Sequence, residues 1–242
     1  MVNSKYLTRL SYEISNRLFN FIGNLLTKEW DARLLGLSKL PIATIIDVGA
    51  NDGQFAKKIS KIFPQASIYA FEPLTEPFKK LENWAVRHNG RVTVFNVALG
   101  DAVQEIQIHN HLYFHPASSI LATTQLCERI YPMLSKQETL TIQQSTLDRE
   151  LSHLPHPLHP DILIKLDVQG YEDRVIRGGR ETFKKATACI VEIALDRLYE
   201  NQAEFRDIFI LMDSLGYRYA GNLDQICAKD GHVRYLNAIF LK

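Results

Sequence analysis

The chain is poor in cysteine and in excess charge, and each scarcity excludes a class of protein. Its 242 residues include three cysteines, Cys127, Cys189 and Cys227, which lie far apart. An odd number at this spacing gives neither a disulfide framework nor a metal-binding motif, and it fits a reducing compartment. The formal net charge is +1, so bulk electrostatics gives no reason to expect nucleic-acid binding.

Long apolar runs are missing as well. No segment approaches the ~18 consecutive apolar residues of a membrane span. The N-terminus shows no charged-then-apolar leader with a small-residue cleavage site. We therefore expect a cytoplasmic protein, and 46% apolar residues over this length suit one α/β domain with a short extension.

The chain does contain a strand, a glycine turn and a helix in direct succession. Residues 45–53 read Ile-Ile-Asp-Val-Gly-Ala-Asn-Asp-Gly, which predicts a buried strand followed by a helix over residues 54–63. Gly49 allows a tight turn and the close approach of a ligand. The helix start offers unpaired N–H groups. A second expected strand, residues 67–71, ends at Glu72, where an acid commonly binds the two ribose hydroxyls of an adenosine-bearing cofactor.

The glycine spacing separates two candidate cofactors. The turn Gly49-Ala-Asn-Asp-Gly53 lacks the middle and third glycines of the dinucleotide fingerprint G-x-G-x-x-G. Asp47 at the strand end is a poor neighbour for a pyrophosphate, but it suits a cation such as the amino group or sulfonium of S-adenosylmethionine. A strand-to-helix turn that binds no ligand is the plain alternative, and it would leave Glu72 unexplained.

Strands and helices alternate from residue 41 to the end of the chain, which predicts a parallel sheet with helices on both faces. The expected strands are residues 42–48, 67–71, 92–98, 161–167 and 188–194, and the expected helices are residues 54–63, 76–88, 172–185 and 205–215. Two final strands are expected over residues 217–220 and 235–241.

Two segments lie outside this alternation. Residues 1–40 form an N-terminal extension, in which residues 4–26 have the apolar spacing of an amphipathic helix. We expect this helix to pack on the main domain, residues 41–242, or on a partner subunit of a homo-oligomer. Contact with a membrane surface is a weaker alternative, because the segment has few cations.

Residues 100–160 form an insertion between the third and fourth strands that is too long for a plain loop. Short strands are expected within it over residues 104–108 and 139–143. Because it follows the carboxyl end of a strand, the insertion should overhang the ligand crevice and face the substrate.

Six short motifs occur in an order typical of one protein family. They are Asp47-Val-Gly-Ala-Asn-Asp-Gly-Gln54, Phe71-Glu72-Pro73, Asn96-Val-Ala-Leu-Gly-Asp101, Ser118-Ser119, Thr146-Leu-Asp148 and Ile164-Lys-Leu-Asp-Val-Gln-Gly-Tyr-Glu172. In these motifs, residues 40–242 resemble the FkbM-type class I methyltransferases. The resemblance implies a Rossmann-like, doubly wound, mostly parallel sheet with an antiparallel C-terminal strand. It also implies methyl transfer from S-adenosylmethionine, usually to an oxygen of a sugar or other secondary metabolite.

The resemblance and the expected strand ends together select candidate cofactor residues: Asp47, Gly49, Asn51, Asp52, Gly53 and Glu72. Asp101, after the third strand, is either an adenine-facing acid or a turn residue. Ser118 and Ser119 match a family motif within the insertion, and we expect them to contact the substrate or the carboxylate of the cofactor.

The candidate catalytic residues lie near the end of the fourth strand. Methyl transfer to an alcohol requires alignment of the nucleophile and removal of a proton, and Asp167 stands where a base is needed. Lys165 lies on the same face two residues earlier, as a catalytic group or as an ion-pair partner of Asp167. Glu172 opens the next helix, as a functional carboxylate or as a helix cap. Glu192, ending the fifth strand, is a candidate substrate contact.

Metal-assisted chemistry is left open by these residues, since Asp167 and Glu192 are also suitable ligands for a divalent ion. His109, His111 and His115 lie close in sequence, and they suggest a zinc site less strongly than a histidine base. The leading hypothesis is an S-adenosylmethionine-dependent O-methyltransferase that acts on a small hydroxylated molecule. Its rivals are a catalytically silent nucleotide-binding module and a nicotinamide-dependent oxidoreductase.

Overall fold

The computed structural model describes residues 34–88 and 90–242, so the helix expected over residues 4–26 lies outside the described residues. A central sheet has the strand order β3-β2-β1-β7-β8-β10-β9. Its strands are β1 (Thr44–Val48), β2 (Ser67–Phe71), β3 (Val92–Phe95), β7 (Ile162–Leu166), β8 (Ala188–Ala194), β9 (Arg218–Cys227) and β10 (Val233–Leu241). The first five of these in sheet order are parallel, and β10 runs antiparallel to both β8 and β9. The mostly parallel sheet with antiparallel C-terminal strands is thus confirmed.

The two central strands, β1 and β7, are adjacent in the sheet, although the chain visits β2 and β3 between them. The order of the sheet reverses here, and the carboxyl ends of strands at such a point form the ligand crevice of open α/β sheets. Every residue of both strands is buried. Strands buried on both faces should read as continuous apolar runs, so Asp47 and Lys165, which are paired in register, are exceptions.

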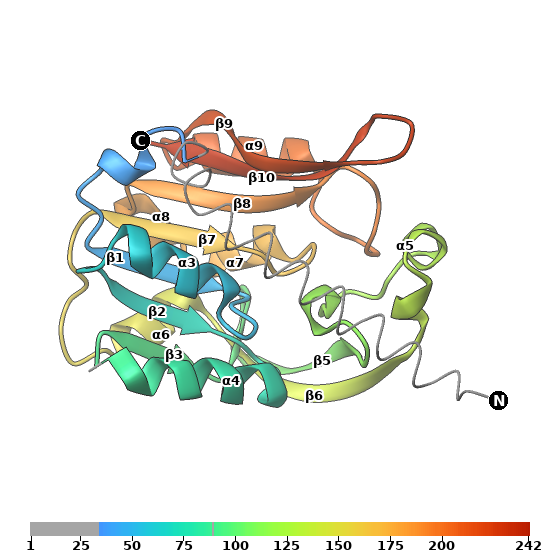
Figure 1. Ribbon diagram of the computed structural model, residues 1–242, viewed down its shortest axis with the longest axis horizontal. Helices are drawn as coiled ribbons and strands as arrows, with labels where there is room; N and C mark the ends of the chain where they lie inside the picture. The colour runs from blue at the N-terminus through green and yellow to red at the C-terminus, as the bar shows by residue number, and fades with distance from the viewer. Residues whose placement is uncertain (1–33, 89) are drawn as a thin grey trace.

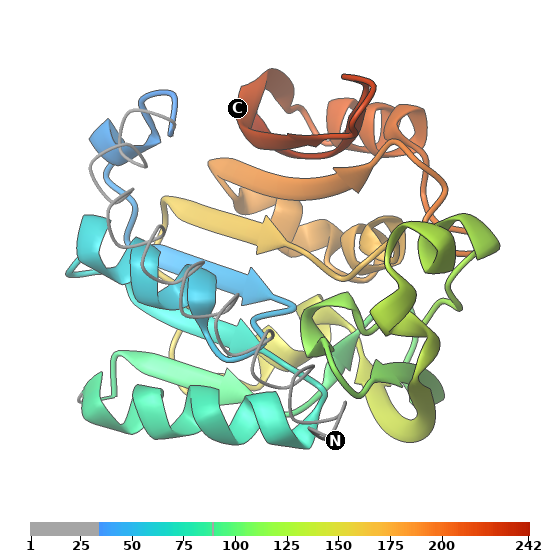
Figure 2. The ribbon, with the colours of Figure 1, turned by 45° about the vertical axis from the view of Figure 1, so that its right-hand side comes forward.

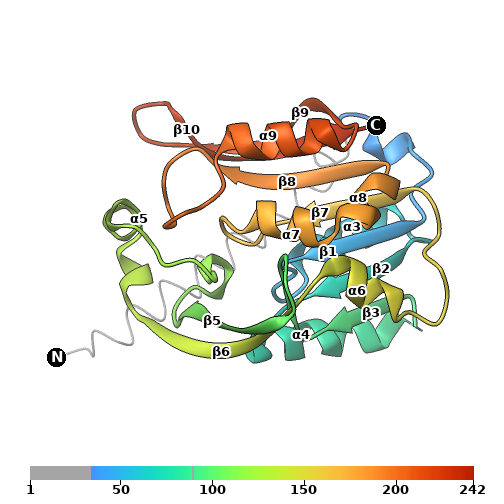
Figure 3. The ribbon, with the colours of Figure 1, turned by 180° about the vertical axis from the view of Figure 1, so that it is seen from behind.

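Helices cover the sheet on both faces (Figures 1 and 3). On one face lie α3 (Gln54–Ile62) and α4 (Thr75–Ala85), and on the other lie α6 (Leu147–Ser152), α7 (Glu172–Gly178), α8 (Arg180–Lys185) and α9 (Phe205–Ser214). Alternate strand residues feed two hydrophobic cores, one that contains Ile45 and Leu163 and one that contains Ile46 and Ile164. Short 3₁₀ turns occur at η1 (Leu37–Lys39) and η2 (Val86–His88). No helix among the described residues is long and apolar enough to cross a membrane.

The insertion builds a small second sheet of order β4-β6-β5. It comprises β4 (Ala98–Leu99), β5 (Gln104–His111), η3 (His115–Ala117), α5 (Gln125–Ile130), η4 (Pro132–Ser135) and β6 (Gln137–Ser145). The short strands expected over residues 104–108 and 139–143 are therefore present and are longer than expected. Figure 2 brings this segment forward and shows it beyond the carboxyl ends of the parallel strands.

Two expected elements are each divided in the structure. The single strand expected over residues 92–98 stops at Phe95, and Ala98–Leu99 pairs with β6 in the second sheet. Asn96 interrupts it, because its side-chain amide donates to the backbone carbonyls of Glu72 and Pro73. The helix expected over residues 172–185 is split into α7 and α8 at Gly179.

Candidate active site

The turn after β1 is tied to the end of β2 through Glu72. Its Oε2 accepts the backbone N–H of Asn51 at 2.8 Å, and its Oε1 accepts that of Leu74 at 2.8 Å. Asn51 adopts a left-handed backbone conformation (φ 49°), which Asn tolerates better than most residues. Burial raises the pKa of Glu72 to about 7, against the two backbone hydrogen bonds, which lower it. Each carboxylate oxygen keeps a second lone pair for a ligand.

Asp47 is fully buried at the end of β1. Neither of its carboxylate oxygens accepts a hydrogen bond of normal geometry from the described residues. Lys165 Nζ lies 3.9 Å from Oδ1. Burial raises the pKa of Asp47 to about 6, although Lys165 lowers it. Unsatisfied buried carboxylates are costly and rare, so Asp47 is a candidate ligand contact.

Gly49 brings the turn after β1 against the end of β7. Its φ is 76°, and a Cβ added there would lie 1.9 Å from the backbone oxygen of Asp167. No side chain fits in that space, so the absence of a Cβ serves the contact between the two strand ends as well as any ligand. Gly53 precedes α3 with φ 89°, and Asp52 Oδ1 lies 3.9 Å from Lys57 Nζ on the surface beside it.

Asp167 follows β7, and its side chain is 31% exposed. Lys165 Nζ donates to its Oδ2 at 2.9 Å, and Gln169 Nε2 donates to its Oδ1 at 2.6 Å. Burial opposes ionisation, but Lys165 and hydrogen bonds from Glu192, Lys165 and Gln169 bring the pKa of Asp167 down to about 2. Asp167 is therefore ionised at neutral pH.

Lys165 stays protonated. Burial lowers its pKa, but the charges of Asp167 and Asp47 outweigh burial, so the pKa is raised overall. The structure thus favours the ion-pair interpretation of Lys165 over a role as proton acceptor.

Glu192 lies in β8, two residues before the strand ends at Ala194, rather than at the strand end as expected. Its Oε2 accepts Gln169 Nε2 at 2.8 Å. Burial raises the pKa of Glu192 well above its ordinary value, and the negative charge of Asp167 raises it further. Of the two carboxyls, Glu192 therefore binds a proton more readily than Asp167.

Glu172 contacts the loop between β7 and α7 rather than the opening of the site. Its Oε1 accepts the backbone N–H groups of Val168 at 3.0 Å and Gly170 at 3.2 Å. The residue is 4% exposed, and burial raises its pKa to about 7. These contacts favour a role in shaping the loop.

The two serines of the insertion have their hydroxyls engaged by the protein. Ser119 Oγ donates to the backbone oxygen of Gln169 at 2.8 Å and accepts the N–H of Leu121. Ser118 Oγ accepts the N–H of His111 at 3.0 Å. Ser119 therefore fastens the insertion to the loop that carries Asp167.

Asp101 lies apart from the end of β3. It is exposed, it follows β4, and its Cα would lie 3.2 Å from a Cβ added at Gly178 in α7. The residue that directly follows β3 is Asn96.

Sequence reasoning missed two residues that the structure brings to the site, Gln169 and Tyr199. Gln169 bridges Asp167 and Glu192, and Tyr199 Oη lies 2.7 Å from Gln169 Oε1. A signal for Gln169 existed, since it lies inside the most distinctive motif. Tyr199 gave none, because it meets Gln169 only in the folded chain.

The histidines of the insertion show no metal arrangement. Among residues 34–88 and 90–242 no group of three or more His, Cys, Asp or Glu side chains is placed to hold a metal ion. His111 Nδ1 lies 2.7 Å from the backbone oxygen of Leu134, and His115 Nδ1 lies 2.9 Å from Asn110 Oδ1.

The strand order, the antiparallel β10 and the carboxylates that end β1 and β2 define a class I S-adenosylmethionine-dependent methyltransferase. Within that class the chain belongs to the FkbM family, whose model, described as "Methyltransferase FkbM domain", matches residues 47–219. The expected family is thus confirmed, and the interpretation as a nicotinamide-dependent oxidoreductase is not supported.

Two curated relatives match most of the chain. The 2-O-methyltransferase NoeI of Sinorhizobium fredii (strain NBRC 101917 / NGR234) is 27% identical over 194 residues, which are 75% of this chain and 76% of NoeI. Methyltransferase 1 of Beauveria bassiana (strain ARSEF 2860) is 24% identical over 73% of this chain and 72% of its own length.

Solved structures overlap with the chain at low sequence identity. Magnesium protoporphyrin IX methyltransferase from Synechocystis PCC 6803 gives a TM-score of 0.46 at 13% identity, over 88% of this chain and 78% of its own. Precorrin-6y C5,15-methyltransferase from Geobacter metallireducens GS-15 gives 0.44 at 13% identity, over 88% and 87%. The strand order, rather than these overlaps, defines the fold.

Proposed function

We propose that this methyltransferase transfers the methyl group of S-adenosylmethionine to a hydroxyl oxygen of a small acceptor, either a saccharide or another secondary metabolite. The observation that carries the proposal is Asp167, an ionised, partly exposed carboxylate at the carboxyl end of a central strand. The 2-O-methyltransferase name of the relative NoeI supports an oxygen acceptor.

The residues at the ends of β1 and β2 fit the cofactor. Glu72 directs two backbone-supported oxygens with spare lone pairs, which suits the two hydroxyls of a ribose. Asp47 offers an unsatisfied carboxylate to a cationic group. The turn that carries Gly49, Asn51, Asp52 and Gly53 would complete the cofactor side. Bound S-adenosylmethionine supplies an electrophilic methyl group.

Asp167 would accept the proton of the acceptor hydroxyl as the oxygen attacks the methyl carbon. Proton transfer to a positioned base is typically worth about 10²–10⁴ in rate. Lys165 would keep Asp167 ionised and fixed through the 2.9 Å contact. The insertion, residues 100–160, would face the acceptor, with Ser118, Ser119 and Glu192 on that side of the site.

A two-part experiment tests the proposal. Calorimetry with S-adenosylhomocysteine and, separately, NADH measures cofactor choice. Radiolabelled methyl transfer from S-adenosylmethionine to a panel of oligosaccharides, polyols and phenols measures acceptor choice. We expect binding of S-adenosylhomocysteine alone, and methylation that mass spectrometry places on an oxygen.

Two alternatives are separated by the same assays. Tight S-adenosylhomocysteine binding with no acceptor methylated across the panel would favour a silent binding module. A divalent ion at Asp167 would show itself as activity that EDTA removes and Mg²⁺ restores.

A further inference from the structure

The side-chain amide of Gln169 lies between two carboxyl groups. Its Nε2 donates to Asp167 Oδ1 at 2.6 Å and to Glu192 Oε2 at 2.8 Å. Tyr199 Oη lies 2.7 Å from its Oε1. The chemistry fixes the orientation of the amide, because the reversed amide would place its acceptor oxygen against the ionised carboxylate of Asp167.

The backbone of Gln169 is held in an unfavourable conformation. Its φ of 57° lies in the left-handed region, which is uncommon for residues other than glycine, asparagine and aspartate. Ser119 fixes its carbonyl, and Glu172 accepts the N–H groups of Val168 and Gly170 on either side of it. A strained residue held by its surroundings in this way points to a functional constraint.

Charge also couples the two carboxyls that Gln169 contacts. Lys165 Nζ contacts Asp167 at 2.9 Å and also lies 3.9 Å from Asp47, so its charge is already shared. Two desolvated carboxyls on one donor cannot both ionise without strong repulsion, and they titrate as a pair. The ionisable groups that face Glu192 are Lys165, Asp167, Glu172, Tyr199 and Tyr235.

We propose that Gln169 is a positioning residue whose side-chain amide holds Asp167 and Glu192 together as one proton-sharing pair. The pairing is a property of the unliganded protein, whereas its use in catalysis rests on the proposed function. In the reaction, the acceptor oxygen bonds to the methyl carbon, the sulfur–carbon bond breaks with its electrons going to sulfur, and the hydroxyl proton goes to Asp167. Glu192 keeps its own proton, and the pair later releases the added one to solvent.

The test measures the protonated carboxyl directly. Infrared spectra of the unliganded protein are recorded across pH, and Glu192→Gln identifies the carbonyl band of the protonated Glu192 by removing it. In Gln169→Leu, the loss of two N–H donors that favour the ionised forms should raise the midpoint of this band by about one to two pH units. Tyr199→Phe frees the amide to rotate and should shift the midpoint less, in the same direction.

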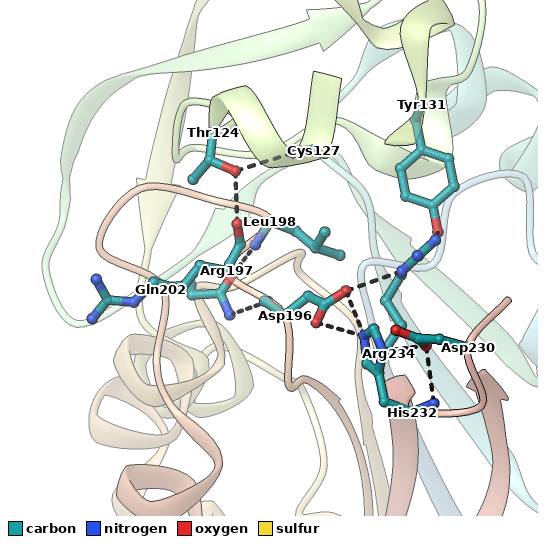
Figure 4. Close-up of polar contacts among 10 residues, drawn as sticks. All are labelled: Thr124, Cys127, Tyr131, Asp196, Arg197, Leu198, Gln202, Asp230, His232 and Arg234. Atoms are coloured by element: carbon teal, nitrogen blue, oxygen red, sulfur yellow. Dashed lines mark hydrogen bonds and ion pairs between the residues drawn. The ribbon is translucent and has the colours of Figure 1, made fainter. Parts of the chain in front are cut away.

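Gln202 provides a matched control. Its Oε1 accepts the N–H of Leu198 and its Nε2 donates to the carbonyl of Asp196 (Figure 4). The same two atoms also bond to the N–H of Tyr199 and the carbonyl of Ala194. No contact joins it to either carboxyl among the described residues. Gln202→Leu should lower the melting temperature and leave the midpoint of the band unchanged.

Three results would overturn the inference: an unchanged midpoint in Gln169→Leu, an equal shift in Gln202→Leu, or no band that depends on Glu192. If Gln169→Leu does not fold, an unchanged midpoint in Tyr199→Phe would likewise overturn the inference. Where an acceptor is known, Gln169→Leu should move the acidic limb of the kcat profile to higher pH, with KM for S-adenosylmethionine unchanged. Failure to find any methyl transfer would leave the infrared result intact, so the two proposals fail separately.

Discussion

The two halves of the candidate site are held together in different ways: the cofactor side, with Glu72 and the turn after β1, and the acceptor side, with Asp167 and Glu192. On the cofactor side, the hydrogen bonds to Glu72 come from backbone N–H groups at most 21 residues away. On the acceptor side, the Gln169 side chain contacts both Asp167 and Glu192. Gln169 is itself held by Ser119, 50 residues away, through its backbone carbonyl, and by Tyr199, 30 residues away, through its side chain. The cofactor side is therefore a local product of two strand ends, whereas the acceptor side forms only when the insertion packs against the sheet.

This difference separates binding from chemistry. A cofactor shared by many enzymes can be held by a local turn, because few substitutions elsewhere in the chain disturb such a turn. An acceptor side built from distant segments can change with the insertion while the cofactor side stays the same. If the two halves are independent, a substitution on one side should leave the function of the other side unchanged.

The largest effect is expected on the acceptor side, from Asp167→Asn. Without the carboxylate, methyl transfer should fall by about 10²–10⁴, since the hydroxyl loses its proton acceptor. S-adenosylhomocysteine affinity should change by less than about threefold, because the link between the Asp167 carboxylate and Asp47 is indirect, through Lys165, which lies 3.9 Å from Asp47. Single-turnover transfer and calorimetry measure the two quantities.

Asp173→Asn is the control for that substitution. Asp173 lies on α7 and pairs with Arg174 and Arg177. The Asp173→Asn substitution should leave both the rate of methyl transfer and the affinity for S-adenosylhomocysteine at the wild-type level. An equal loss of affinity and rate in Asp167→Asn would break the comparison, since the halves would then act as one.

Gly49→Ala tests the point where the two halves touch. An alanine methyl 1.9 Å from the backbone oxygen of Asp167, at φ 76°, must push the ends of β1 and β7 apart. We expect a loss of about 3 kcal/mol or more in the free energy of unfolding, measured by urea denaturation.

Gly216→Ala separates backbone strain from steric contact. Gly216 has φ 85°, but a Cβ added there meets nothing within 4 Å. Its substitution should cost only about 1–2 kcal/mol, the penalty of a left-handed residue. Similar losses of unfolding free energy in Gly49→Ala and Gly216→Ala would show that the contact with Asp167 adds nothing to the cost of backbone strain.

The sequence predicted the cofactor side better than the acceptor side for the same physical reason. Alternating strands and helices, the turn at Gly49 and the acid at Glu72 are local patterns, and the expected strand over residues 67–71 matches β2 at both ends. The expected strand over residues 92–98 ran too far, because the Asn96 side chain stops β3 by bonding to carbonyls 23 and 24 residues away.

The acceptor side required information that no short window contains. Asp167 and Glu192 could be chosen because they stand near strand ends, and Lys165 because it lies two residues before Asp167 on the same face. Two other features follow from packing between segments far apart in sequence. Ser119 supports the loop rather than offering a free hydroxyl, and Tyr199 orients Gln169. The motif Thr146-Leu-Asp148 also acts at long range, since Asp148 accepts the N–H groups of Glu181 and Thr182 at the start of α8.

A smaller effect is expected from Glu72→Gln on the cofactor side. The amide can still face the ribose hydroxyls but loses one acceptor and the charge, so S-adenosylhomocysteine should bind about 10- to 100-fold more weakly. Transfer at saturating S-adenosylmethionine should be nearly unchanged.

The pH dependence of binding sharpens this test. The folded pKa of Glu72 is raised to about 7 from 4.5, so its ionisation opposes folding and the stability it contributes is lost as pH rises through 7. The ionised form is the better hydrogen-bond acceptor, so wild-type affinity should rise through the same range. Glu72→Gln should lack this rise, and a parallel rise in the variant would assign it to another group.

The smallest effect is expected at the outer edge of the acceptor side, where the C-terminal hairpin meets the insertion. Asp196 binds His232 at 3.1 Å and Arg234 at 3.1 Å, and Arg234 reaches the Tyr131 hydroxyl at 3.4 Å (Figure 4). Hydrogen bonds to Asp230 and Asp196 raise the pKa of His232. Its stabilising contribution is therefore complete below the ordinary value of 6.5 and is lost as pH rises through the raised value.

His232→Gln should therefore melt below the wild type in acid, and the gap should close as pH rises past the raised pKa. Salt should reduce the gap, because exposed ion pairs are screened. The rise of S-adenosylhomocysteine affinity with pH should be the same in His232→Gln as in the wild type, since that rise depends on Glu72 in the other half. If His232→Gln did change the affinity for S-adenosylhomocysteine, the hairpin of β9 and β10 and the insertion would be coupled to the cofactor side. The two halves would then not be independent.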